Sequence, residues 1–274
     1  MLSTYVINLL AVAALMVAGW LVSVRRRNVT LVDSLWGLGF VLIAWLTVLR
    51  SDGFMPRALL LAVLASCWGL RLTAYLTWRN QGKGEDPRYG AWRKQYGDRF
   101  WVVSLFNVFL VQALFMWVIA LSMQYGQMSR APAGLTWTDF LGAMVWLVGF
   151  SFEAVGDWQL ARFKADPANA GRVMNRGLWA FSRHPNYFGE MLVWWGMFII
   201  TLSAPGGMWT IISPILITLT LLKLTGVALT EKTILDKKPE YRQYIQTTSA
   251  FIPWFPKRRE HACTDRSCRS GNPA

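Results

Sequence analysis

Apolar runs of about 20 residues, the length that a helix needs to cross a bilayer core, recur along the chain between shorter polar segments. Each run is long enough, and sufficiently free of charge, to predict a transmembrane helix. The pattern therefore predicts an all-α integral membrane protein, a bundle of about seven transmembrane helices. The predicted spans are residues 5–24, 32–49, 58–78, 101–123, 137–160, 187–203 and 209–230.

Composition agrees with this interpretation, because 54% of the residues are hydrophobic and only 16% are charged. A soluble domain contains about a quarter charged residues. We predict one transmembrane domain over residues 1–257 and a polar, disordered tail over 258–274. Three cysteines do not form a disulfide framework. His261, Cys263 and Cys268 in the tail are a weak metal-binding signal, and a plain polar tail is the alternative.

The net charge of +13 first suggests nucleic acid, but the basic residues follow the predicted topology. All but five of the 28 Lys and Arg residues fall on one side of the predicted spans. This asymmetry is typical of the cytoplasmic side of a membrane protein. We therefore predict a multi-pass protein of the bacterial inner (cytoplasmic) membrane, with its N-terminus periplasmic and its C-terminus cytoplasmic. Membrane lipid and a lipophilic small molecule are the expected partners, and nucleic acid is not. The five exceptions are Arg50, Arg57, Arg71, Arg130 and Lys223.

Charged side chains inside spans are costly unless they are paired or face a cavity. Glu153 and Asp157 are four residues apart, so both lie on one face of the fifth span. They either serve chemistry or pair with Arg71, Arg79 or Arg183. Asp33 lies near the start of the second span. It either caps that helix, as Asp often does, or faces a cavity in its neutral form and donates a hydrogen bond to a carbonyl oxygen.

The segment 177–190 collects polar groups where an apolar span begins: Arg183, His184, Asn186, Tyr187 and Glu190. His184 precedes Pro185, which predicts a helix start whose free N–H groups suit an anion. A membrane-interface belt is the alternative. The polar loop 79–89 either folds over a nucleotide or is a solvated linker. Gly37 and Gly39 do not belong to a Gly-rich dinucleotide-binding motif, because no strand precedes them and a membrane span follows. A dinucleotide would therefore have to bind between helices.

With these residues in view, the chain resembles a known family. The segment 177–190, Glu153-x-x-x-Asp157-x-Gln159 upstream and Pro239-Glu240-Tyr241-x-x-Tyr244 downstream are similar to the bacterial branch of the steroid 5α-reductase family. That branch is often described only as a domain of unknown function. More distantly, the chain resembles the sterol carbon-14 and carbon-7 reductases and the isoprenylcysteine carboxyl methyltransferases. The resemblance extends from about Asp33 to Pro256.

The resemblance implies a seven-helix membrane reductase that binds NADPH in a cytoplasm-facing cavity and reduces a carbon–carbon double bond of a lipophilic enone. It implies that Asp33 polarises the substrate carbonyl. The animal enzymes place a tyrosine on the third span beside that acid, where this chain has Trp68, so Tyr75 or Tyr89 is expected to substitute. The residues expected to contact the cofactor are Glu153, Asp157, Arg162, Lys164, Arg176, Trp179, Arg183, His184, Asn186, Tyr187, Glu190 and Tyr241.

Two other functions share parts of this pattern. An S-adenosylmethionine-dependent methyltransferase is the closer one, because the Arg-His-Pro-x-Tyr segment and the stretch 231–244 also occur in the isoprenylcysteine enzymes. A lipid-binding or small transport protein would use the intramembrane charges only for pairing. The cofactor that stabilises the purified protein separates these three interpretations.

Overall fold

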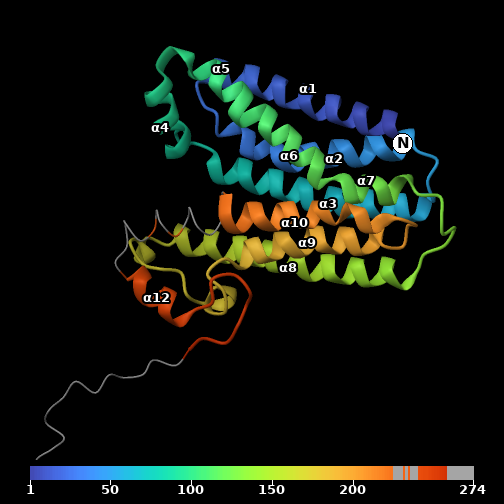
Figure 1. Ribbon diagram of the computed structural model, residues 1–274. Coiled ribbons are helices and arrows are strands. Elements are labelled where there is room, and N and C mark those ends of the chain that lie inside the picture. The colour runs from blue at the N-terminus through green and yellow to red at the C-terminus, as the bar shows by residue number, and fades with distance from the viewer. Residues whose placement is uncertain (225–230, 232–233, 235–239, 258–274) are drawn as a thin grey trace, which may run out of the picture.

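The chain folds into a bundle of helices that run lengthwise beside one another, with no strand among the residues that the structure describes (Figure 1). In this computed structural model the described residues are 1–224, 231, 234 and 240–257. The predicted all-α class is confirmed. Helices suit a chain inside a bilayer because each one satisfies its own backbone hydrogen bonds.

Five helices are long and apolar enough to cross a membrane, and they match the first five predicted spans. Each exceeds or equals the length of about 20 residues that a bilayer core requires. In chain order they are α1 (Leu2–Arg26), α2 (Leu31–Arg50), α3 (Met55–Asn80), the helical run Pro87–Ile119, and α8 (Trp137–Ala165).

The helical run that contains the fourth span starts at Pro87, before the predicted residue 101, because part of the predicted polar loop is helical. Asp86 caps the N-terminus of α4 (Pro87–Tyr96) by accepting a hydrogen bond from the Arg88 amide at 2.9 Å, and Pro87 fits the first helical position. The run then includes a π-helical segment and ends at Ile119, and a separate short helix follows. These elements are η1 (Gly97–Arg99), α5 (Phe100–Ser104), η2 (Leu105–Leu110), α6 (Val111–Ile119) and α7 (Leu121–Met128).

The sixth and seventh predicted spans correspond to shorter helices packed along the bundle. The sixth is α9 (Pro185–Thr201), and the seventh is a run of η5 (Gly207–Ile211), α10 (Ile212–Leu219) and η6 (Thr220–Leu224). Residues 225–230 of the predicted seventh span, and the predicted tail 258–274, lie outside the described residues. The remaining short elements are η3 (Pro167–Asn169), η4 (Gly177–Ala180) and α12 (Tyr241–Thr247).

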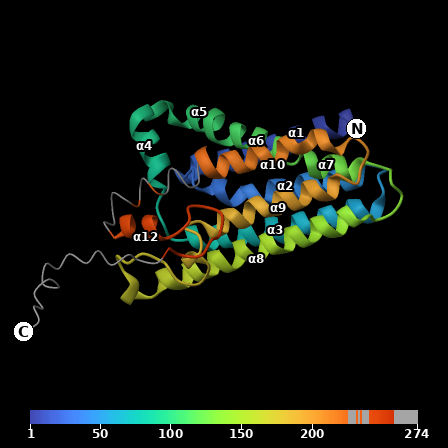
Figure 2. The same cartoon turned by 60° about the horizontal axis from the view of Figure 1, so that its bottom comes forward.

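The N-terminus lies at one end of the bundle, and α4 and α12 lie at the other (Figures 1 and 2). Both long connections, 79–100 and 161–186, are also at the end that carries α4 and α12. We call this the basic end, because it carries most of the Lys and Arg residues counted above. Placing the basic end in the cytoplasm remains a prediction.

Glycines allow α8 and α9 to approach backbone to backbone. A Cβ atom on Gly142 would lie 2.6 Å from the Gly196 carbonyl oxygen, and the reverse contact has the same distance. Gly149 and Gly189 face each other in the same way. Such small residues let helices pack closely in lipid, where burial from water does not drive association.

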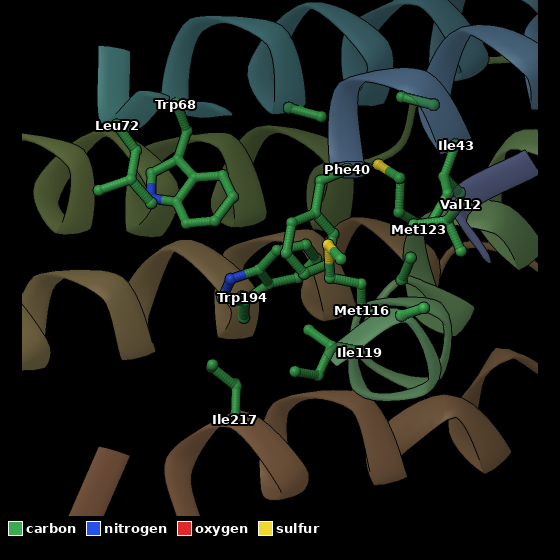
Figure 3. Packing of buried hydrophobic residues seen from close by; sticks show 14 of the residues in the cluster. Val12, Phe40, Ile43, Trp68, Leu72, Met116, Ile119, Met123, Trp194 and Ile217 are labelled. Carbon is green, nitrogen blue, oxygen red and sulfur yellow. The ribbon is translucent and has the colours of Figure 1, made fainter. Parts of the chain in front are cut away.

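Three large aromatic side chains join α9 to α2 and α3 in the middle of the bundle (Figure 3). Phe40 lies 4.4 Å from Trp194 and 5.5 Å from Trp68, measured between ring centroids, and all three residues are fully buried. The tilted and edge-on geometries are the favourable ones for aromatic pairs. This packing sets the position of α9 along the axis of α3. It therefore also decides which polar residues of the two helices lie next to each other.

We expect Gly189→Ala to destabilise the protein by about 1–3 kcal/mol, the usual cost of overpacking. The added Cβ would meet the backbone of Glu153, including its Cα atom at 2.9 Å. Thermal unfolding in detergent measures the effect. Gly90→Ala is the control, because a Cβ there meets no atom within 4 Å and Ala favours the helix. Equal melting temperatures for the two variants would contradict the proposed close packing.

Candidate active site

A buried ion-pair network joins α3 to α8. The Arg71 guanidinium contacts Asp157 Oδ2 at 2.7 Å with one nitrogen and forms a close ion pair with Glu153 with another. Trp68, one turn before Arg71, donates its indole N–H to Glu153 Oε2 at 2.7 Å. The predicted placement of both carboxylates on one helix face is confirmed, and of the three alternative pairing partners the structure shows Arg71.

The first turns of α9 complete this network. Asn186 donates to Asp157 Oδ1 at 3.1 Å. Glu190 is close enough to Arg71, Glu153 and Asp157 to interact with all three charges, and Trp36 of α2 lies near it. We call Arg71, Glu153, Asp157, Asn186 and Glu190 the Arg71 cluster. Three carboxyl groups thus share one arginine inside the bundle.

The far end of the bundle carries a second buried arginine with a different balance of partners. Arg57 donates to both oxygens of Asp139, at 2.8 and 3.1 Å, and to the carbonyl oxygen of Gly134 at 2.9 Å. One cation is matched there by one carboxylate, and both side chains are at most 1% exposed. That arrangement is what a purely structural pair requires. The Arg71 cluster has an excess of carboxyl groups and therefore differs from it.

Two polar atoms of the Arg71 cluster have no partner within the described part of the chain. They are the donor Arg71 Nε and the acceptor Asn186 Oδ1. Buried polar groups are nearly always hydrogen-bonded, so each unmet atom needs an explanation. The Arg71 side chain also remains 20% exposed, although its two carboxylate partners are at most 7% exposed. The cluster therefore presents an unmet donor, an unmet acceptor and an accessible cation on neighbouring helices.

Asp33 does not cap α2. The helix begins at Leu31 with Thr30 as its N-cap residue, so Asp33 lies inside the first turn and makes no capping bond. The capping interpretation is wrong because the helix starts earlier than the hydropathy boundary suggested. The Asp33 carboxyl group instead interacts with the Tyr89 hydroxyl of α4, with Arg88 and Arg79 also near it. Trp36, which contacts Glu190, lies one turn further along α2.

Glu85 and Asp86 fasten α4 to the start of α2, and so bring Tyr89 to Asp33. Glu85 accepts from the Val29 amide and from two nitrogens of Arg93, each at 2.8 Å. The Asp86 amide donates to Thr30 Oγ1 at 2.8 Å. Burial alone would raise the pKa of Glu85, but these hydrogen bonds and the Arg93 charge outweigh it and lower that pKa. Glu85 and Asp86 thus form an anchored strap, whereas residues 81–84 of the predicted polar loop are exposed.

The Arg-His-Pro segment starts α9 as predicted, with His184 as the N-cap residue and Pro185 at the first helical position. Arg183, however, faces the C-terminal segment. It holds Glu231 through two hydrogen bonds, at 2.7 and 3.1 Å, and donates to the Thr248 carbonyl oxygen at 2.6 Å. The His184 Nε2 atom lies 3.2 Å from Glu231. Most of the Arg183 hydrogen-bonding capacity is thus used within the protein.

Glu231 is held as an anion at this junction. Burial favours its neutral form, but the hydrogen bonds and charges of His184 and Arg183 prevail and lower the pKa of Glu231 to about 2. The Ser249 carbonyl oxygen accepts from the Arg183 amide at 2.9 Å, which ties the same segment to the start of α9. The C-terminal segment thus packs on the start of α9 at the basic end, in the same way as the segment before α4 packs on the start of α2.

Sequence comparison assigns a family to this arrangement. Residues 19–248 match the family described as "Protein of unknown function (DUF1295)". The chain belongs to this family. The predicted family assignment is therefore confirmed, and the matched range contains the whole Arg71 cluster together with Asp33 and Tyr89.

The DUF1295 chain is also similar to an uncharacterized protein of Schizosaccharomyces pombe. The two are 27% identical over 266 residues, which cover 85% of this chain and 75% of the relative. No solved structure matches the chain significantly. The bacterial inner membrane thus remains a prediction, whereas a multi-pass membrane protein follows from the five long apolar helices.

The structure brings together only part of the site expected in this DUF1295 protein. Glu153, Asp157, Asn186 and Glu190 meet in one cluster, and His184 stacks on Tyr187 with ring centroids 5.4 Å apart beside it. Of the two candidate tyrosines, Tyr89 contacts Asp33, whereas the Tyr75 hydroxyl lies 3.5 Å from the Asp157 carbonyl oxygen.

The other expected cofactor residues form no hydrogen bond to the side chains of the Arg71 cluster among the described contacts. Trp179 donates its indole N–H to the Gly156 carbonyl oxygen at 3.0 Å, and Tyr241 is buried against Tyr244. Burial, the largest influence, and the nearby Glu231 charge raise the pKa of Tyr241 to about 12. Both side chains therefore support the basic end rather than open into the cluster. The three remaining expected residues, all exposed, are Arg162, Lys164 and Arg176.

Three members of the site were not among the expected site residues: Arg71, Trp68 and Trp36. Arg71 carried a signal in the sequence as a charge inside an apolar span, which made it a candidate, but no catalytic or cofactor-binding role was assigned to it. Nothing in the sequence indicated that Trp68 donates to Glu153 or that Trp36 lies near Glu190, because 16 tryptophans are spread over the chain.

Two cavities of about 450 Å³ lie at the basic end. One is between the end of α1 and α5, and the other is between residues 163–180 and α12. Neither is lined by the Arg71 cluster. Its unmet polar atoms and excess carboxyl groups, rather than a large empty volume, identify the cluster as the candidate active site.

We expect Arg71→Gln to destabilise the protein by up to about 3–5 kcal/mol, because it leaves buried carboxylates unpaired. Adding Glu153→Gln should restore part of that loss, because one uncompensated charge is removed. Thermal unfolding of Arg71→Gln, Glu153→Gln and the double variant gives the coupling free energy between the two side chains. Arg130→Gln is the control, because its pair with Asp52 is exposed and should contribute less than about 1 kcal/mol. Additive effects at 71 and 153 would contradict the pairing.

Proposed function

We propose that this DUF1295 protein is an NADPH-dependent reductase that acts on a carbon–carbon double bond of a lipophilic enone. The observation that carries the proposal is the pair of unmet atoms in the Arg71 cluster, the donor Arg71 Nε and the acceptor Asn186 Oδ1. A primary carboxamide offers the complementary acceptor and donor, and the nicotinamide ring carries such a group. This complementarity supports the choice of a nicotinamide cofactor.

When bound, NADPH supplies a hydride for the β-carbon of the enone. Arg71 and Asn186 would hold the nicotinamide amide, and Glu153, Asp157 and Glu190 fix these two side chains through the contacts described above. The apolar side chains of α2, α3 and α9 next to the cluster would favour a lipophilic substrate.

Asp33 is the residue proposed to act on the substrate carbonyl. In its neutral form it donates a hydrogen bond to that oxygen as negative charge develops there, and the enolate is then protonated at its α-carbon. Tyr89 orients the carboxyl group, because its hydroxyl contacts Asp33. The strap built on Glu85 and Asp86 holds Tyr89 in place. Net, one hydride and one proton add across the double bond.

The methyltransferase alternative is favoured by one feature, the excess of carboxyl groups. Three carboxyl groups around one arginine would also suit the positively charged sulfonium of S-adenosylmethionine. The alternative leaves the Asp33–Tyr89 contact without a role, because methyl transfer to a carboxylate needs no acid at a carbonyl oxygen.

We expect NADPH, and not S-adenosylmethionine, to raise the melting temperature of the protein purified in detergent. A ligand at 100 times its dissociation constant stabilises by about 2.7 kcal/mol, which such a measurement detects. NADPH oxidation is then followed against a panel of steroid, sterol and polyprenyl enones. Stabilisation by S-adenosylmethionine alone would replace the proposed function with methyl transfer. Stabilisation by neither cofactor would favour a non-enzymatic lipid-binding protein.

We expect Asp33→Asn to keep NADPH affinity and lose turnover by a factor of about 10²–10⁴, the usual contribution of a general acid or base. Nucleotide binding is measured by thermal shift and turnover by absorbance at the nicotinamide band. Asp52→Asn, an exposed carboxylate at the opposite end of the bundle, is the matched control and should retain full activity. Full activity of Asp33→Asn would remove this residue from the mechanism.

A further inference from the structure

The cavity between α1 and α5 lies on the perimeter of the bundle, away from the candidate active site. It is bounded by the end of α1, at Ser23 and Arg27, and by Phe100, Trp101 and Ser104 of α5. Its volume of about 450 Å³ is within the range of about 300–1,000 Å³ that is typical of ligand pockets. Polar and apolar groups both line it.

This cavity lies at the level where the membrane core ends. The apolar run of α1 stops at Val24 and is followed by Arg25, Arg26 and Arg27. Trp20 stacks on Trp101 with ring centroids 6.0 Å apart, and its indole N–H donates to the Trp101 carbonyl oxygen at 2.9 Å. Tryptophans at helix ends next to basic residues mark the boundary between lipid tails and headgroups.

The side of α1 next to the cavity faces lipid. Leu21 is 58% exposed and Val24 is 41% exposed, and Trp101 on α5 is 54% exposed. Such apolar exposure is stable only against acyl chains. A molecule in this cavity can therefore reach into the lipid phase on one side and contact the basic residues on the other.

The two arginines that line the cavity differ in whether they have a partner in the protein. Arg93 donates two hydrogen bonds of 2.8 Å to Glu85. The Arg27 guanidinium makes no hydrogen bond or ion pair to any residue that the structure describes. Asp98 is the one acidic side chain that lines the cavity. Arg27 is thus the available cation, with Asp98 opposing it.

We infer that this cavity binds the headgroup of an anionic phospholipid, with its phosphate at Arg27 and its glycerol backbone and upper acyl chains against Val24 and Trp101. Basic pockets at the headgroup level are known to hold acidic lipids. A free phosphate offers the same charge but nothing to cover the apolar lining, which is why a lipid is the better ligand.

The test uses the full chain in neutral detergent. Phosphatidylglycerol is titrated against phosphatidylcholine and against inorganic phosphate, with the melting temperature and the mass of bound lipid as readouts. Phosphatidylglycerol should stabilise the protein and remain bound in native mass spectra, whereas the other two should not.

Charge variants test the assigned residues with opposite signs. Arg27→Gln should weaken phosphatidylglycerol binding by roughly fivefold, as expected for one basic residue at a lipid surface. Arg27→Lys should retain it, and Asp98→Asn should strengthen it because the opposing charge is lost. Arg50→Gln removes an exposed arginine at the opposite end and should change nothing.

Three results would overturn the inference. Equal stabilisation by phosphatidylcholine would show that headgroup charge has no role. Equal stabilisation by inorganic phosphate would indicate a free-anion site. Unchanged binding in both Arg27→Gln and Asp98→Asn would place the lipid elsewhere. None of these outcomes depends on NADPH, so the proposed reductase is tested separately.

Discussion

The structure depends on one arginine placed inside an apolar bundle. A charge at membrane depth is costly unless it is paired, so Arg71 can exist on α3 only if other helices bring carboxylates to it. Glu153 and Asp157 provide them from α8, and Glu190 approaches from α9. The need to pair Arg71 therefore determines how α3, α8 and α9 are placed relative to one another. The glycines between α8 and α9 allow it to be met at short range.

The two ends of the bundle use charge in different ways. At the end with the N-terminus, Arg57 and Asp139 satisfy each other and are shut off from solvent, so they only join α3 to α8. At the basic end, two further ion pairs fasten the segments that close the bundle: Glu85 with Arg93, and Arg183 with Glu231. The Arg71 cluster lies inward of these closures.

The sequence predicted the features that depend on local pattern. Apolar runs located the first five spans, the spacing of Glu153 and Asp157 placed both on one face, and His184-Pro185 marked the start of α9. Features that depend on distant partners were missed. The polar composition of 79–100 concealed α4, because its helix is stabilised by contacts to the start of α2. The partner of Arg183 could not be identified from the sequence either, because Glu231 lies 48 positions further along the chain.

The departure at Trp68 is explained by the same contacts. In the enzymes that the chain resembles, a tyrosine on the third span lies beside the catalytic acid, but here the Trp68 indole is directed to Glu153 and supports the Arg71 cluster. A phenol near Asp33 must then come from another helix. Tyr89 provides it from α4, whose position depends on Glu85 and Thr30 rather than on α3. On the proposed chemistry, the strap is therefore part of the active site, because it holds Tyr89 beside the acid.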